Sequence, residues 1–187
     1  LDRAEAIDRN CVRVKMVRID DSVKPSAQLA YLADLETDDP ALASMLACRR
    51  ALAYLQDSDL LGAEREAKTA EELDPDSVTV HVVLVNLELQ KARVALATDR
   101  PFVVASVLAI HERALEIREQ LAEMGRFEES VRLLMMAADA RSLLRDQDGA
   151  RTTLEEALSQ EICAEQGAAV LGDAALRCAA PKLALRF

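Results

Sequence analysis

The stretch YLQDSDLLGAEREAKTAEELDP, residues 54–75, decides the fold. It contains an aromatic residue, a polar turn at 57–59, alanines at positions 63, 67 and 70, and a closing Asp-Pro pair. Residues three and four apart lie on the same side of a helix, so the alanines form one small-residue face. The residue before a proline avoids helical backbone angles, and this ends the helix at Leu73. We therefore expect half of a helical hairpin that is built to stack on further hairpins.

The composition of the 187-residue chain favours an all-α fold. It is 51% hydrophobic but only 3% aromatic, with no Trp, so its apolar side chains are mostly those of Ala, Leu and Val. Small aliphatic side chains suit close packing of helices better than a β-sandwich, which favours aromatic and β-branched residues. With five Gly and five Pro, the chain has few turn signals and therefore long elements.

Similar local signals place the boundaries of the other helices. Asp39 is the expected N-cap of a helix that has Pro40 in its first turn, and Gly125 is a natural residue to follow a helix. The alternating segment from Cys11 is assigned to helix because no partner strand is evident, and the β-branched run from Val78 because its surroundings are helical. About nine helices are predicted, over residues 1–19, 25–37, 40–56, 60–73, 76–97, 102–124, 127–145, 150–160 and 164–178.

The chain also shows internal repetition. Asp39-Pro40 and Asp74-Pro75 lie 35 positions apart, each at a helix start, with two helices and a short turn between them. A period in the mid-thirties that holds two helices resembles the tetratricopeptide repeat. The resemblance implies one domain over 1–187, a right-handed α-solenoid of four or five antiparallel helical hairpins.

The match to that repeat is best over residues 44–77. The family has small residues where the two helices cross, an aromatic late in the first helix and a proline after the second. The corresponding residues here are Ala51, Tyr54, Ala63, Ala70 and Pro75. Two partial matches lie only about 20 residues apart, so helix 127–145 is expected to contact two neighbours. They add the packing positions Gly125, Ala137, Ala150 and Ala157.

If the resemblance holds, the first helix of each repeat lines a concave groove. The residues at these positions are mostly apolar, which favours a hydrophobic or amphipathic partner segment over a clamp for carboxylates. A neighbouring helix of the same protein filling this surface is an equally weighted alternative. The groove positions are Met45, Cys48, Leu52 and Leu55 in the best repeat, and Thr79, Val82, Asn86 and Leu89 in the next.

The charge of the chain limits its partners. The net charge is −10, from 33 acidic and 23 basic residues, and an acidic surface repels phosphate backbones. We therefore expect no nucleic-acid partner. In addition, no apolar run in the sequence approaches the length of a membrane span, so we expect no membrane partner. The acidic stretch 57–76 could serve as a surface for a basic partner segment, but a solvated outer helix face is the favoured explanation.

The sequence contains no recognisable catalytic or metal-binding motif. His81 and His111 have no nearby partners of a catalytic set, and the four cysteines are isolated from one another and from histidine. We expect no catalytic residues, no metal site and no cofactor. Free thiols among apolar residues indicate a reducing compartment, which predicts an intracellular protein of the cytoplasm or nucleus.

These observations predict a protein-protein interaction scaffold, not an enzyme. Its partly apolar groove would receive a protein or peptide partner, an amphipathic or basic segment. The alternative is a ligand- or peptide-sensing regulatory module of a larger multidomain protein. The chain begins at Leu1 and not at Met, so we expect it to be a fragment of a longer chain.

Overall fold

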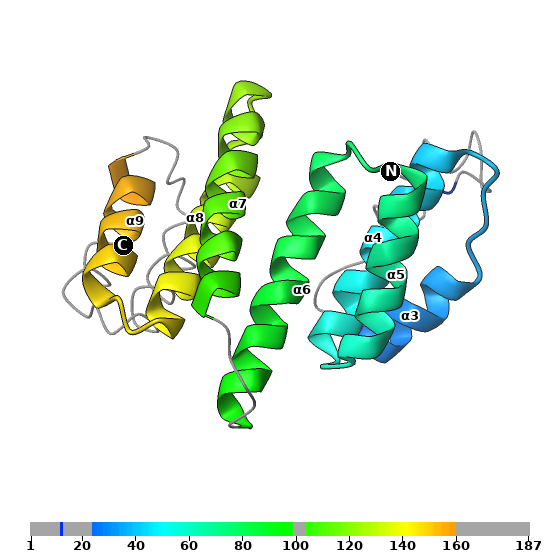
Figure 1. Cartoon of the computed structure of the whole chain (residues 1–187). Coiled ribbons are helices and arrows are strands. Elements are labelled where there is room, and N and C mark those ends of the chain that lie inside the picture. Colours follow the sequence, from blue (N-terminus) through cyan, green and yellow to red (C-terminus); the bar gives the residue numbers. More distant parts are fainter. Residues whose placement is uncertain (1–11, 13–23, 99–103, 160–187) are drawn as a thin grey trace. The chain divides into compact units, whose positions relative to one another are not determined.

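A computed structural model describes Val12, residues 24–98 and residues 104–159. Every regular element in these ranges is a helix, which confirms the all-α prediction (Figure 1). The two predicted helices over 1–19 and 164–178 lie outside the described residues, apart from Val12. The described helices are α3 (Pro25–Ala33), α4 (Pro40–Gln56), α5 (Leu60–Leu73), α6 (Val78–Ala97), α7 (Val104–Glu123), α8 (Phe127–Leu143) and α9 (Gln147–Ser159).

Most of these helices begin and end where local sequence signals place them. The Asp39 carboxylate accepts hydrogen bonds from the main-chain N–H groups of Ala41 and Leu42, and so caps α4. Asp74 ends α5 with an extended backbone (φ −151°, ψ 78°), as the following proline requires. The β-branched run from Val78 is helical, as predicted. Two boundaries differ by three residues or more, because α3 ends at Ala33 and not at position 37, and α9 begins at Gln147 and not at position 150.

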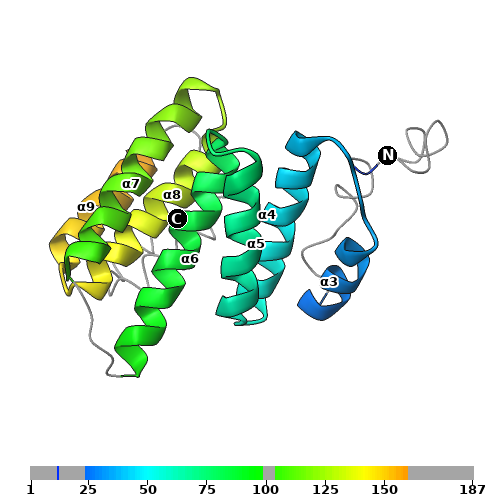
Figure 2. The ribbon, with the colours of Figure 1, turned by 45° about the vertical axis from the view of Figure 1, so that its right-hand side comes forward.

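The chain divides into two compact units, Leu1–Leu87 and Glu88–Phe187. In the first unit, α4 and α5 pair as a hairpin, and α3 packs on α4 (Figure 2). Alanines form the contact between α4 and α5, and three side chains from the start of α6 complete this core. Its buried members are Ala47, Cys48, Ala51, Ala63, Ala67, Ala70, Val80, Val83 and Leu87.

In the second unit, α8 packs against both α7 and α9. This confirms the expectation that the helix after Gly125 contacts two neighbours. The α8 side chains that make these contacts are small or aliphatic, and Leu133, Leu134 and Ala137 are fully buried. The helix therefore belongs to two hairpins at once.

The turns of the α4–α5, α7–α8 and α8–α9 hairpins share one geometry. In each turn one residue has a left-handed backbone: Ser58 (φ 63°), Gly125 (φ 71°) or Arg145 (φ 61°). Its N–H bonds a carbonyl three residues back and the next N–H bonds a carbonyl five residues back, which is the Schellman arrangement. The paired bonds are Ser58 to Leu55 with Asp59 to Tyr54, Gly125 to Ala122 with Arg126 to Leu121, and Arg145 to Ser142 with Asp146 to Arg141.

A small, fully buried residue follows each of these turns at the same distance. Ala63, Ser130 and Ala150 each donate the N–H of the first helical bond, to the carbonyls of Asp59, Arg126 and Asp146 respectively. All three are 0% exposed. Helices approach closely only where their contact residues are small, so these positions mark the helix crossings.

Candidate functional site

Arg50 of α4 fixes the loop that joins α3 to α4. Its Nη2 donates to the carbonyl oxygens of Leu32 at 2.8 Å and Leu35 at 3.1 Å, and its Nε also reaches Leu32. Glu66 of α5 lies 3.9 Å from the same guanidinium. Carbonyls at the end of a helix lack partners within the helix, and Arg50 supplies one. This long-range contact accounts for the early end of α3.

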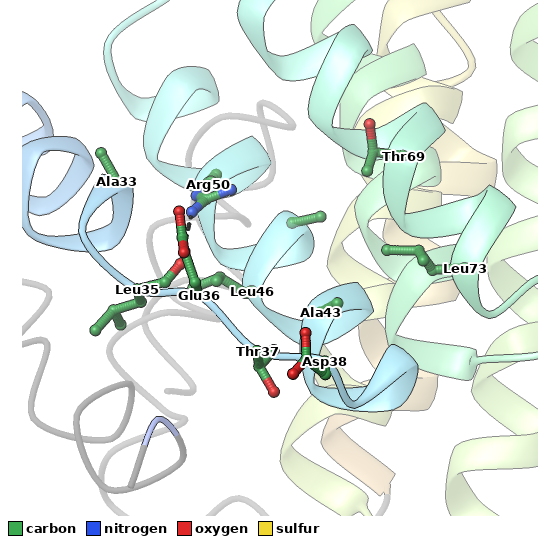
Figure 3. A pocket seen from close by; sticks show the side chains of 11 residues that line it. Ala33, Leu35, Glu36, Thr37, Asp38, Ala43, Leu46, Arg50, Thr69 and Leu73 are labelled. Atoms are coloured by element: carbon green, nitrogen blue, oxygen red, sulfur yellow. Dashed lines mark hydrogen bonds between the residues drawn. The ribbon is translucent and has the colours of Figure 1, made fainter. Parts of the chain in front are cut away.

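The loop held by Arg50 forms one wall of an open hollow of about 510 Å³ (Figure 3). Its floor is apolar and comes from α4, with Leu73 contributed by α5. Figure 3 shows Glu36, Thr37 and Asp38 along the loop and Thr69 on the opposite side. The lining residues are Ala33, Leu35, Glu36, Thr37, Asp38, Ala43, Leu46, Ala47, Arg50, Thr69 and Leu73.

The floor of the hollow is continuous with a small buried cluster. Leu32, Leu35 and Leu46 pack together, and Val12 lies against them. Leu35 and Leu46 belong both to this cluster and to the hollow. The apolar surface at the floor is therefore held by packing, and is not formed by loose side chains.

The predicted groove positions of α4 occupy a different face of that helix from the hollow. Met45 is 40% exposed, whereas Cys48 is 2% exposed and lies in the core shared by α4 and α5. Leu52 and Leu55 are half-buried and pack against this core. None of these four residues lines the hollow.

The predicted groove positions of α6 are mainly half-buried. Thr79, Val82 and Asn86 have intermediate exposure, and Leu89 is 2% exposed. Met45 is therefore the most exposed residue of the predicted groove set. That these residues contact a partner stays a prediction.

The residues predicted to pack the repeats lie at or near the helix contacts. Ala51, Ala63 and Ala70 meet in the first core with Tyr54 against them, and Pro75 is exposed just after α5. In the second unit Gly125 forms its turn, and Ala137 and Ala150 are fully buried. The side chain of Ala157 lies outside the described residues.

The second unit contains a polar array that sequence reasoning missed. The ring of His111 is buried, with Nδ1 3.1 Å from the Ala137 carbonyl oxygen and Nε2 3.2 Å from Nη2 of Arg141. A guanidinium only donates, so Nε2 accepts and Nδ1–H donates. Arg141 also pairs with Asp146 at 2.9 Å, which joins α7, α8 and the start of α9.

Asp146 completes this array as the cap of α9. Its Oδ1 accepts the N–H of Gly149 at 2.9 Å. The Gly149 hydrogen bond, and next the Arg141 guanidinium, hold the pKa of the Asp146 carboxyl below its ordinary value. The hydrogen bonds and the ion pair of the array tie α7, α8 and the start of α9 together, while Nε of Arg141 is buried without a hydrogen-bond partner among the described residues.

The thiol of Cys48 is unsuited to nucleophilic chemistry. Its burial, and secondarily the charge of Asp74, raise the pKa of the thiol to about 11. A thiol is nucleophilic as its thiolate, which Cys48 does not form near neutral pH. Among the described residues, no group of three or more His, Cys, Asp and Glu side chains is placed to bind a metal ion.

Comparisons with known proteins do not assign the chain to a family. Neither models of known protein families nor curated proteins match it. None of the helices in residues 24–98 and 104–159 combines the length and apolar character that crossing a membrane requires.

The hollow is the second feature that sequence reasoning did not find. Its signals were present as the acidic run DLETDD at 34–39 and as the pair Arg49-Arg50 in a mostly apolar helix. Nothing in the sequence pairs Arg50 with the carbonyls of Leu32 and Leu35. The hollow can be recognised only when the contact of Arg50 with these two carbonyls is known.

Proposed function

We propose that the chain is a protein-interaction scaffold whose helical hairpins stack as a right-handed solenoid and hold a helix or peptide of a partner protein. The observation that carries the proposal is the repetition of one hairpin turn around Ser58, Gly125 and Arg145. Repeated hairpins bury their small residues against one another and leave extended surfaces for binding.

The surface chemistry supports a binding role for the first unit. Met45 is an exposed, flexible apolar side chain on α4, of the kind that adapts to partner surfaces. The hollow next to Arg50 adds a concave surface on the same helix, which both apolar and acidic residues line. The free, buried thiol of Cys48 supports our proposal that the protein works in a reducing, intracellular compartment.

Site-specific photo-crosslinking in an extract of the source cells tests this function. A photoreactive amino acid is placed singly at Met45, at Thr69 beside the hollow, and at Thr152 on α9 as the control. The expected result is a discrete protein adduct from Met45 or Thr69 that is absent from Thr152. Equal labelling from all three positions, or no adduct from any, contradicts a scaffold that binds through the first unit.

A further inference from the structure

We propose that the hollow between the α3–α4 loop, α4 and α5 binds a cationic side chain from an amphipathic, lysine- or arginine-bearing segment of a partner protein. This inference rests on the proposed scaffold function and specifies the partner. Its evidence is the charge around the hollow, the apolar floor and the way the site is held open.

The rim of the hollow is acidic and its charge is not balanced. Glu36 and Asp38 line the hollow, and Asp34 lies on the same loop. All three are exposed, and none of them makes an ion pair with another described residue. Among the lining residues Arg50 is the one cation, and two carbonyls and Glu66 already engage it. No described residue that lines the hollow is left to balance these carboxylates, so a further cation, which we assign to a partner segment, is the complementary charge.

The floor fits the rest of such a side chain. Ala43 and Leu73 offer apolar surface beneath the acidic loop, next to the buried Leu46. Lysine and arginine lay their methylene stems on apolar surface while their charged heads remain with water or carboxylates. The volume of about 510 Å³ also leaves room for an apolar neighbour of the cation, which favours an amphipathic segment.

Arg50 has a positioning role in this site. Its bonds to the Leu32 and Leu35 carbonyls hold the loop against α4, and the loop carries Glu36 and Asp38. Figure 3 shows the Glu36 side chain extending toward the Arg50 end of the hollow, with Asp38 further along the loop. The two carboxylates thus meet a bound segment at separate points.

Binding of a fluorescein-labelled peptide of alternating leucine and lysine, measured by anisotropy on the full chain, tests the inference. The double variant Glu36→Gln with Asp38→Asn neutralises the two rim carboxylates that line the hollow. Its control, Glu112→Gln with Glu116→Gln, makes the same change of net charge at two exposed residues of α7. We expect the rim variant to weaken binding about tenfold and the control less than about twofold.

Two tryptophan substitutions distinguish binding of the peptide in the hollow from its general attraction to an acidic protein. Thr69 and Thr152 are both exposed, and each hydroxyl donates to the carbonyl four residues earlier, Arg65 and Asp148 respectively. Thr69→Trp fills the hollow from its edge, whereas Thr152→Trp places the same bulk on α9. Loss of peptide binding with Thr69→Trp alone, at an unchanged thermal midpoint, supports the site.

Several results overturn the inference. Equal effects of the rim and control variants mean that the peptide senses only net charge. Tighter peptide binding after Arg13, Lys15 and Arg18 are replaced by Gln means that the chain's own segment is the occupant. A dimer that the rim variant dissociates means that a second copy is the occupant.

The failure of this inference is distinguishable from failure of the proposed function. If Met45 captures a discrete partner and the rim variant leaves that capture unchanged, the scaffold stands and the hollow is not its cation site. If neither Met45 nor Thr69 captures a partner, the proposed function itself fails.

Discussion

Ser44 and His111 hold equivalent places in two different hairpins. The Ser44 hydroxyl donates to the carbonyl oxygen of Ala70, and Nδ1 of His111 donates to that of Ala137. Both contacts measure 3.1 Å and both span 26 positions of sequence. A hydroxyl and an imidazole therefore perform the same task, which is to tie the first helix of a hairpin to the second helix.

Replacing Ser44 by Ala tests this tie. We expect the free energy of unfolding to fall by about 0.5–1.5 kcal/mol, the net value of one hydrogen bond. The loss is at the low end because the Ala70 carbonyl also accepts from the N–H of Asp74. Urea unfolding followed by tyrosine fluorescence measures the loss, since both tyrosines, Tyr31 and Tyr54, lie in the first unit. Ser26→Ala, at an exposed serine, is the control and is expected to be neutral.

Ala63→Leu tests the crossing of α4 and α5. Ala63 is 0% exposed and packs in the first core, so a larger side chain must displace its neighbours. We expect destabilisation of roughly 1–3 kcal/mol, seen as a lower thermal midpoint. Ala41→Leu makes the same change at an exposed residue of α4 and is expected to leave the midpoint nearly unchanged. Equal midpoints for the two variants would place the crossing elsewhere.

Gly62→Ala tests the fit between α5 and the end of α4. A Cβ at position 62 would lie 2.6 Å from Cδ1 of Tyr54 and 2.7 Å from Oδ2 of Asp59, the α5 cap. Overpacking of about 1–3 kcal/mol is expected to exceed the gain of about 1 kcal/mol in helix propensity.

A double-mutant cycle identifies the cause of this loss. In a Tyr54→Leu background the ring is absent, so Gly62→Ala is expected to cost less than in the unaltered chain. The same cost in both backgrounds would show that the Asp59 cap, and not the Tyr54 ring, limits the space at position 62.

The Cys48 thiol gives the stability of the first unit a dependence on alkaline pH. Burial raises the pKa of this thiol in the folded chain from 9.0 to about 11. Below pH 9 the thiol is protonated in both states; as the pH rises from 9 toward 11, the unfolded chain loses the proton first and stability falls. We expect Cys48→Ala to show a shallower decline of unfolding free energy over this interval. If the unfolding free energy of both proteins declined equally steeply between pH 9 and 11, the raised pKa of the Cys48 thiol would be refuted.

Local signals in the sequence were enough to locate α4 and α5. Asp39 and Asp59 are capping residues and Asp74 precedes a proline, so each boundary depends on residues within a few positions of it. The left-handed residue of the α7–α8 turn was also predictable, because it is Gly125. The same conformation at Ser58 and Arg145 was not, since neither residue type favours it.

The candidate site depended on contacts that the sequence does not specify. Arg50 bonds carbonyls 15 and 18 positions away, and that contact shapes the wall of the hollow. Cys48 was predicted to face a groove, yet its side chain lies within the alanine core of the hairpin. A helical repeat pattern identifies which positions are apolar, but neighbouring helices decide which of these positions stay accessible.

Hydrogen–deuterium exchange of the full chain, with and without the protein captured through Met45 or Thr69, tests the scaffold most directly. Binding excludes water from the surface it covers and slows local opening, so protected amides mark the contact. We expect slower exchange in the α3–α4 loop, along α4 and at the end of α5 near Leu73. Unchanged exchange throughout residues 24–87 would contradict the claim that the first unit receives the partner.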